Sequence, residues 1–257
     1  MTKLLKPLQW LYCIYAFLTF VIIMIPIFLL ALIASLFGPR RGGNLIYGLC
    51  SLWADIWFFL IGIFHRNIYE APHHKRKQYV FIANHTSYLD APVLVKTIRQ
   101  PLRALGKIEM RKVPLFGFMY SKLHITVDRS KLKSKYNSLK RSLEAIDQGK
   151  SLVIYPEGAI VTEREPVMGR FKDGAFRVSI EKQIPIVPVT IVYNWIILPA
   201  DDFVLHWHPL KVVFHEPIEP NGITMNEIDQ LKEKTRLVIE DELKKYVPHG
   251  NPSRVTE

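Results

Sequence analysis

The sequence is poor in cysteine, in acidic residues and, over its first quarter, in charge, and each shortage excludes a class of protein. Only Cys13 and Cys50 occur among 257 residues, and both lie in apolar stretches, where a thiol behaves as a small hydrophobic group. A disulfide-stabilised scaffold and a Cys-x-x-Cys metal site are therefore excluded. Apolar residues make up 49% of the chain, which is too many for an intrinsically disordered protein.

Acidic residues number 23 against 34 lysines and arginines, so the formal net charge is +11. Residues 1–64 contain only four basic residues and one acidic residue, and most of the excess therefore lies in the remainder. Such a positive body attracts anionic lipid, an acidic carrier protein, a phosphorylated substrate or nucleic acid. Nucleic acid fits least well, because the arginines are not interleaved with stacking aromatic residues in any known reading motif.

The N-terminal region contains two apolar stretches. Residues 11–37 hold no charge. This stretch is long enough to cross a bilayer and too long for the apolar part of a signal peptide. Pro26 predicts a kink or a shallow helix. Residues 44–64 include Asp55, which is costly at the bilayer centre, so an interfacial or re-entrant helix is expected there. With the Gly- and Arg-rich turn at 38–43, residues 1–68 are predicted to form a membrane-anchoring helical hairpin, held in one leaflet or crossing twice.

Residues 69–257 alternate short apolar runs with charged stretches of helical period, which predicts an α/β domain with a mixed sheet flanked by helices. Apolar residues at helical spacing predict a basic amphipathic helix over 132–146, and a Thr224/Glu227 capping box predicts the start of a C-terminal helix. Six strands are expected, at residues 79–83, 102–105, 124–127, 151–155, 186–193 and 211–215.

The segment FIANHTSYLDAP at 81–92 carries the clearest chemical signal. A strand ends at Asn84 and His85, and Asp90 follows five residues after the histidine. The two side chains can meet if 84–89 is a turn, with Asp90 capping the next helix and Pro92 in its first turn. A carboxylate bonded to one imidazole nitrogen leaves the other free to accept a proton, which predicts His85 as a general base. For an isolated His-x4-Asp pattern, a buried histidine satisfied by a carboxylate is the more usual explanation.

Four sequence motifs that occur in order along the chain favour the general base over the buried histidine. They resemble the motifs of the glycerolphosphate acyltransferase superfamily and, within it, of the 1-acylglycerol-3-phosphate acyltransferases. The motifs contain Asn84, His85 and Asp90; Lys107, Glu109, Pro114 and Gly117; Pro156, Glu157 and Gly158; and Pro188. The resemblance implies direct acyl transfer from acyl-CoA or an acyl-acyl carrier protein to a lysolipid hydroxyl. No acylated enzyme is needed, in agreement with the absence of a Gly-x-Ser-x-Gly elbow.

The resemblance implies catalytic roles for His85 and Asp90, and no cofactor. It implies substrate-binding roles for Asn84, Lys107, Arg129, Glu157 and Gly158. No metal is expected, and His206 and His208 are interpreted as part of a strand-to-loop edge.

The third motif departs from the family pattern, since Ala159 and Ile160 replace a threonine and an arginine that is thought to hold the acceptor's phosphate. The candidates to replace that arginine are Arg129, Arg164, Arg170 and Lys172. The expected acceptor is 1-acylglycerol-3-phosphate. A lyso-aminolipid is the second choice, and a catalytically silent lipid-binding membrane protein is the rival class. The expected location is the inner or cytoplasmic membrane, with the α/β domain on the cytoplasmic side.

Overall fold

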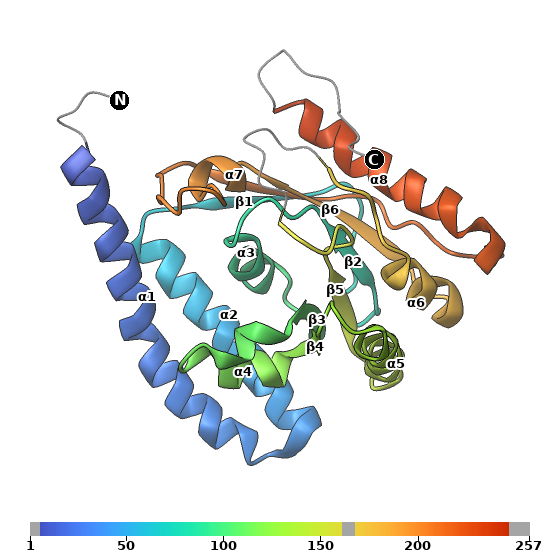
Figure 1. The fold of residues 1–257 in the computed structure, drawn as a ribbon, viewed down its shortest axis with the longest axis horizontal. Coiled ribbons are helices and arrows are strands. Elements are labelled where there is room, and N and C mark those ends of the chain that lie inside the picture. The colour runs from blue at the N-terminus through green and yellow to red at the C-terminus, as the bar shows by residue number, and fades with distance from the viewer. Residues whose placement is uncertain (1–5, 161–167, 247–257) are drawn as a thin grey trace.

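A computed structural model of the chain describes residues 6–160 and 168–246. The N-terminal region is a helical hairpin, formed by α1 (Lys6–Ser35), the short π-helical turn η2 (Gly38–Gly42) and α2 (Gly43–Leu60) (Figure 1). By length and composition alone, both helices could cross a membrane. Pro26 lies inside α1, which continues through it.

One side of the hairpin packs on the rest of the molecule. Tyr47 in α2 donates a hydrogen bond to the carbonyl of Ile98 (2.7 Å), and Asp55 pairs with Lys96 (2.7 Å) and Arg99 (2.6 Å). The charge of Asp55 is therefore neutralised by residues outside the hairpin. Large apolar side chains on the other side of α1, among them Leu18, Ile22 and Leu29, are exposed.

Seven strands form one sheet in the order β1-β7-β6-β2-β5-β3-β4. In the described part of the chain, β6 and β7 are the one antiparallel pair of neighbouring strands, so the predicted mixed sheet is confirmed. The strands are β1 (His65–Tyr69), β2 (Val80–Ala83), β3 (Leu102–Lys107), β4 (His124–Val127), β5 (Ser151–Ile154), β6 (Ile186–Val192) and β7 (Leu210–Phe214). All six predicted strands are present.

The prediction of six strands was nevertheless wrong by one, because β1 at the sheet edge was missed. Its sequence, HRNIY, has no buried residue and carries polar groups on both faces, so it lacks the alternation that reveals a half-buried strand. The sheet thus begins at His65, within the residues assigned to the hairpin. The predicted division into residues 1–68 and 69–257 stays a prediction.

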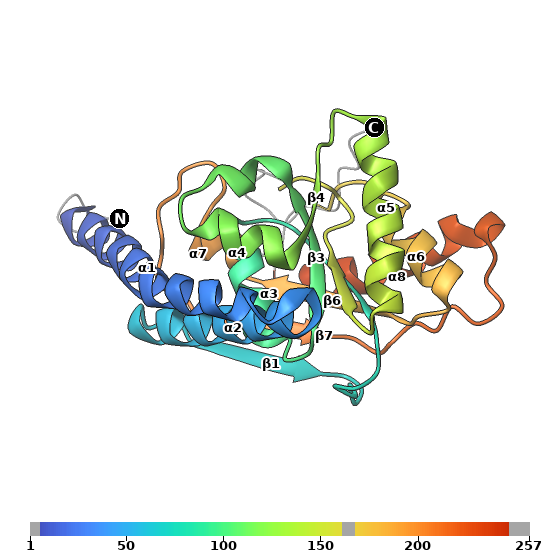
Figure 2. The same cartoon turned by 90° about the horizontal axis from the view of Figure 1, so that it is seen from below.

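Helices cover both faces of the sheet, and an apolar core lies on each side (Figures 1 and 2). The hairpin, α3 (Asp90–Thr97) and α4 (Phe116–Leu123) pack on one face, and α5 (Leu132–Asp147), α6 (Gly174–Lys182) and α8 (Ile228–Lys244) pack on the other. The predicted basic helix is α5, and the predicted capping box precedes α8. The remaining elements are η3 (Ile108–Lys112), α7 (Asn194–Ile197) and η4 (Met225–Glu227).

The parallel strands decide where the polar residues gather. Strands β2, β3, β4 and β5 run in one direction, so their carboxyl ends share one edge of the sheet. Lys107 is the last residue of β3, and the segments that follow the ends of β2, β4 and β5 carry His85, Arg129 and Glu157. Open α/β sheets place their sites at this edge.

Candidate active site

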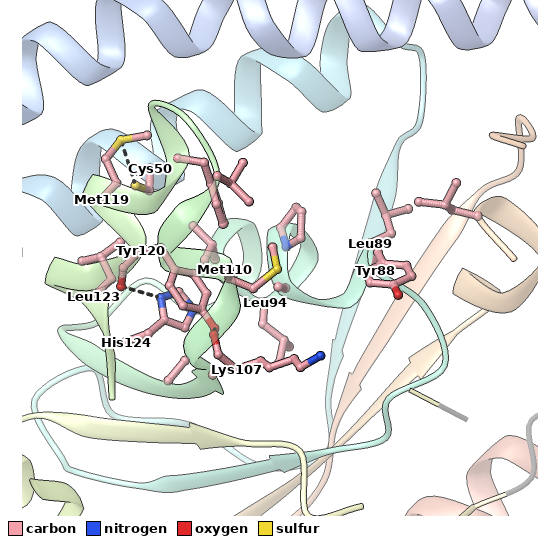
Figure 3. Close-up of a pocket in the computed structure, with 18 of the residues that line it drawn as sticks. Cys50, Tyr88, Leu89, Leu94, Lys107, Met110, Met119, Tyr120, Leu123 and His124 are labelled. Atoms are coloured by element: carbon pink, nitrogen blue, oxygen red, sulfur yellow. Dashed lines mark hydrogen bonds between the residues drawn. The ribbon is translucent and has the colours of Figure 1, made fainter. Parts of the chain in front are cut away.

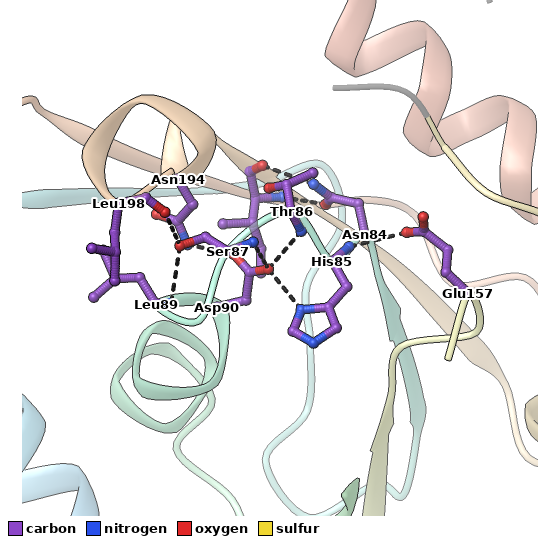
Figure 4. Close-up of polar contacts among 10 residues, drawn as sticks. Asn84, His85, Thr86, Ser87, Leu89, Asp90, Glu157, Asn194 and Leu198 are labelled. Carbon is purple, nitrogen blue, oxygen red and sulfur yellow. Dashed lines mark hydrogen bonds and ion pairs between the residues drawn. The ribbon is translucent and has the colours of Figure 1, made fainter. Parts of the chain in front are cut away.

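His85 and Asp90 meet at the carboxyl end of β2. His85 Nδ1 lies 2.8 Å from Asp90 Oδ2, and the same oxygen accepts hydrogen bonds from the backbone N–H groups of Thr86 (2.8 Å) and Ser87 (2.9 Å) (Figure 4). The predicted turn and contact are confirmed. The prediction that Asp90 is the helix N-cap was wrong, since α3 starts at Asp90 itself and Leu89 is the N-cap. The carboxylate serves the preceding turn and the imidazole instead.

A residue that the sequence did not reveal completes the setting of Asp90. Asn194, at the start of α7 just beyond β6, donates from Nδ2 to Asp90 Oδ1 over 2.6 Å. Both side chains are fully buried. Four donors therefore converge on one carboxylate and fix its position. The only sequence signal was an Asn one residue beyond the carboxyl end of a buried apolar run.

The second imidazole nitrogen of His85, Nε2, is not used to hold the ring in place. His85 Nε2 has no hydrogen-bond partner in residues 6–160 and 168–246, and the side chain keeps 16% of its surface exposed. The ring stacks on Tyr155, with centroids 4.1 Å apart and planes 17° from parallel. Because Nδ1 is bonded to the Asp90 carboxylate and the ring is stacked against Tyr155, Nε2 is the atom that can accept a proton.

Asn84 and Glu157 hold the backbone around His85. The buried Asn84 amide donates to the carbonyl of Ile191 (3.0 Å) and accepts from its N–H (2.8 Å), which ties the end of β2 to β6. Glu157 accepts from the N–H groups of His85 (3.0 Å) and Gly169 (2.8 Å), and its burial raises its pKa to about 7. In this geometry both side chains hold the backbone around His85, and the substrate-binding roles predicted for them stay predictions.

Several cations gather near Gly158. That glycine has φ +76°, and a methyl group on it would lie 2.2 Å from Lys172 Nζ, so a side chain there would collide with the ammonium. Burial lowers the pKa of Lys172, and the positive charges of Arg129 and Lys135 lower it further. Arg129 is exposed and lines the cavity described below.

The other predicted cations differ in position. Lys107 lines the same cavity, and its ammonium lies 3.8 Å from Glu109. Arg170 is exposed, and Arg164 lies outside the described residues. Arg129 and Lys172 are thus the two proposed replacements for the missing family arginine that the fold brings near Gly158.

A cavity of about 720 Å³ separates the hairpin from the sheet and reaches His85. Its wall is mostly apolar and comes from α1, α2, α3, β3 and α4, with Cys50, Leu94, Met110 and Met119 among the lining residues (Figure 3). Trp53, Trp57 and Phe116 also line it, whereas Phe118 packs on Phe28. Burial lowers the pKa of His124 to about 4, so its imidazole adds no charge at neutral pH. A long apolar chain can therefore lie in this cavity with its polar end at His85.

Within the described ranges, no group of three or more His, Cys, Asp or Glu side chains is placed to hold a metal ion. The expectation of a reaction without metal or cofactor stays a prediction. The polar side chains that line the cavity include those of His85, Lys107, Arg129 and His124.

Comparison with known proteins identifies similar chains. A family model described as acyltransferase matches residues 65–192. A probable 1-acyl-sn-glycerol-3-phosphate acyltransferase of Mycoplasma pneumoniae is 29% identical over 232 residues, covering 81% of this chain and 84% of that protein. The 1-acyl-sn-glycerol-3-phosphate acyltransferase of Saccharomyces cerevisiae is 31% identical over 180 residues, covering 68% of this chain and 59% of that protein.

A solved structure shares the fold. The crystal structure of the 1-acyl-sn-glycerophosphate acyltransferase PlsC from Thermotoga maritima aligns with a TM-score of 0.78 over 96% of this chain and 99% of that one, at 16% sequence identity. The alignment includes most of the hairpin as well as the sheet, so the whole architecture is one already seen in an experimental structure.

Proposed function

We propose that this chain, which belongs to the acyltransferase family, acylates 1-acylglycerol-3-phosphate to give phosphatidic acid. The family model matches residues 65–192. One observation carries the proposal: an imidazole fixed by a buried carboxylate presents its free nitrogen to an apolar cavity with cations at its polar end. The names of the Mycoplasma and yeast relatives support the choice of acceptor.

The proposed reaction is a single displacement. His85 Nε2 takes the proton of the acceptor hydroxyl as the oxygen attacks the thioester carbonyl carbon. The carbon–sulfur bond then breaks, and the thiolate leaves with the proton returned by the imidazolium. Asp90 stabilises that imidazolium through Nδ1 and keeps the ring in the reactive tautomer. The acyl donor is proposed to be acyl-CoA or an acyl-acyl carrier protein.

The proposed binding mode follows from the distribution of apolar and charged groups. The acyl chain lies in the cavity, and the acceptor's phosphate lies against Arg129, Lys107 and Lys172. Because acceptor and product are lipids, the exposed apolar face of α1 is proposed to hold the enzyme at a membrane, with the sheet on the cytoplasmic side. An enzyme in the membrane need not extract its substrates.

A second acceptor class is favoured by one observation. Ala159 and Ile160 line the cavity at the positions where the family pattern places a threonine and a phosphate-holding arginine. An apolar wall there suits a lyso-aminolipid without phosphate. Lysophosphatidic acid remains the first choice, because Arg129 and Lys172 lie close by and have no carboxylate partner in the described part of the chain.

The test is acyl transfer by the purified full chain in detergent, from radiolabelled oleoyl-CoA to 1-acylglycerol-3-phosphate or a lyso-aminolipid. His85→Ala is expected to lower kcat by about 100-fold or more, the usual contribution of a general base. The matched control is His74→Ala, which removes an exposed imidazole and is expected to behave as wild type. Equal activity in His85→Ala would refute the mechanism. Transfer by wild type to the lyso-aminolipid alone would replace the first acceptor by the second.

A further inference from the structure

Three cations converge at the turn between α1 and α2, away from the candidate active site. Arg40 lies in η2, Arg103 lies in β3, and Lys150 directly precedes β5. Lys150 Nζ donates a hydrogen bond to Asn44 Oδ1, and a methyl group on Gly43 would lie 2.7 Å from Arg103 Nη2. Both cations thus reach the first residues of α2. Figures 1 and 2 show this turn at the end of the hairpin that lies far from the start of α1. Arg40, Arg103 and Lys150 are called the turn cluster below.

Among residues 6–160 and 168–246, the turn cluster has no acidic partner. Lys150 is only 2% exposed, yet no carboxylate of the described residues lies within 4.0 Å of the three cations. Burial lowers the pKa of Arg103, and burial together with the charges of Arg103 and Arg40 lowers the pKa of Lys150 to about 8. An unpaired buried charge is unfavourable, and like charges beside it add to the cost.

Three other buried or half-buried lysines of this chain are paired with carboxylates. Lys96 reaches Asp55 (2.7 Å), Lys182 reaches Asp147 (2.6 Å) and Lys232 reaches Asp173 (2.7 Å). Lys150 is buried more deeply than these and has only an amide oxygen as partner. Lys150 therefore lacks the negatively charged partner that these three lysines have.

The backbone of the turn is helical on both sides of Gly42, because η2 runs directly into α2 and the N–H of Gly43 donates to the carbonyls of Arg40 and Arg41. The side-chain oxygen of Asn44 is engaged by Lys150. The positive charge at the turn therefore comes from the three side chains of the turn cluster.

The surroundings of the turn cluster favour a lipid over a soluble anion. Leu36, Phe37 and Leu45 expose 83%, 60% and 51% of their surfaces on either side of the turn. Arg40 and Arg41, between them in sequence, are exposed as well. Apolar side chains next to cations match the boundary between acyl chains and phosphates in a membrane. A free phosphate ion would gain nothing from the apolar residues.

We propose that the turn cluster binds the phosphate of an anionic phospholipid, whose acyl chains lie along the exposed apolar side chains of the hairpin. The site is separate from the active site, because Lys150 and Arg103 lie toward the amino ends of β5 and β3, whereas His85 follows the carboxyl end of β2. The proposal rests on the membrane association proposed above and not on acyl transfer. Since α1 and α2 also line the cavity, a lipid bound at their turn would stabilise one wall of it.

The test measures the thermal stability of the full chain in neutral detergent micelles, titrated with phosphatidylglycerol, phosphatidylcholine or inorganic phosphate. Phosphatidylglycerol is expected to raise the Tm of wild type saturably, since a ligand that binds only the folded state stabilises it. Arg40→Gln, an exposed position that does not threaten folding, is expected to weaken the apparent affinity about tenfold, and Lys150→Met at least as much. The matched control is Lys140→Gln, which removes one exposed charge from α5 and is expected to follow wild type.

Four results would overturn the proposal. Phosphatidylcholine could raise the Tm as much as phosphatidylglycerol, Arg40→Gln could bind as wild type does, or Arg40→Gln and Lys140→Gln could lose affinity equally. An equal effect of inorganic phosphate would replace the lipid by a soluble anion and would also reject it. The Tm titration does not depend on acyl transfer. A chain that binds the lipid but transfers no acyl group would therefore contradict the proposed function and leave the lipid site standing.

Discussion

The two sides of His85 differ in how they hold it. On the side of α3, Asp90 contacts the imidazole itself, and its two oxygens accept four hydrogen bonds. On the side of β5, Glu157 contacts only the backbone N–H of His85, while Tyr155 stacks against the ring. Figure 4 shows the two carboxylates on opposite sides of the histidine.

The difference suggests that the two sides have separate tasks. Asp90 sets the tautomer and direction of the imidazole, for which a negative charge matters. Glu157 sets the position of the backbone, for which an accepting oxygen is enough, and the burial that raises its pKa to about 7 shows how poorly that environment solvates a charge. The variants below test this division.

The largest effect is expected for Asp90→Asn, which breaks the side that acts through charge. The amide cannot stabilise the imidazolium, and it would place N–H groups against donors that now bond to the carboxylate. We expect kcat to fall roughly 1000-fold or more, as for loss of the orienting carboxylate of a catalytic histidine. The measurement is steady-state acyl transfer, with Asp241→Asn on the exposed face of α8 as control. Retention of a tenth of the wild-type rate would mean that Asp90 does not orient the base.

Glu157→Gln tests the other side through its pH dependence. Because the folded-state pKa of Glu157 is raised from 4.5 to about 7, its favourable contribution is complete below pH 4.5 and is lost as pH rises through about 7. The neutral glutamine has no such loss. Relative to wild type, the free energy of unfolding of Glu157→Gln is expected to rise by about 2 kcal/mol between pH 5 and pH 8. Urea unfolding at both pH values measures it, and a difference between the proteins that does not change with pH contradicts the prediction.

The sequence predicted the elements that depend on local patterns. Six strands and the helix α5 follow from apolar spacing, and the contact between His85 and Asp90 follows from turn chemistry within six residues. The edge strand β1 was missed because its position in the sheet depends on pairing with β7, more than 140 residues later, and not on its own alternation.

The parts of the site that the sequence did not reveal depend on distant contacts. Asn194 lies 104 residues from Asp90 in sequence, and nothing near it indicates that its amide turns toward β2. Asn84 and Glu157 were placed correctly beside His85, but a sequence does not tell whether a polar side chain points into the cavity or toward the backbone of a neighbouring strand. That direction is decided by partners such as Ile191 and Gly169.

Asn194→Ala measures how much of the Asp90 side depends on this distant contact. The substitution removes one hydrogen bond to a charged group, and three donors to Asp90 remain. We expect kcat to fall about tenfold with little change in KM, since the loss of one charge-assisted hydrogen bond costs about 1.5 kcal/mol or more. Asn137→Ala on the exposed face of α5 is the control. A rise in KM at constant kcat would instead assign Asn194 to substrate binding.

The smallest effect is expected for Tyr155→Phe, which sharpens the contrast on the side of β5. The Tyr155 hydroxyl is buried and has no hydrogen-bond partner within residues 6–160 and 168–246, while its ring supports His85. Phenylalanine keeps the ring and removes the unsatisfied hydroxyl, so stability should be unchanged or rise by about 1 kcal/mol. Tyr155→Ala, which removes the ring as well, should lose about 3 kcal/mol. Urea unfolding of the two variants measures both effects. A marked loss of unfolding free energy in Tyr155→Phe would show that the hydroxyl has a polar partner. The side of β5 would then also hold His85 through side-chain hydrogen bonds.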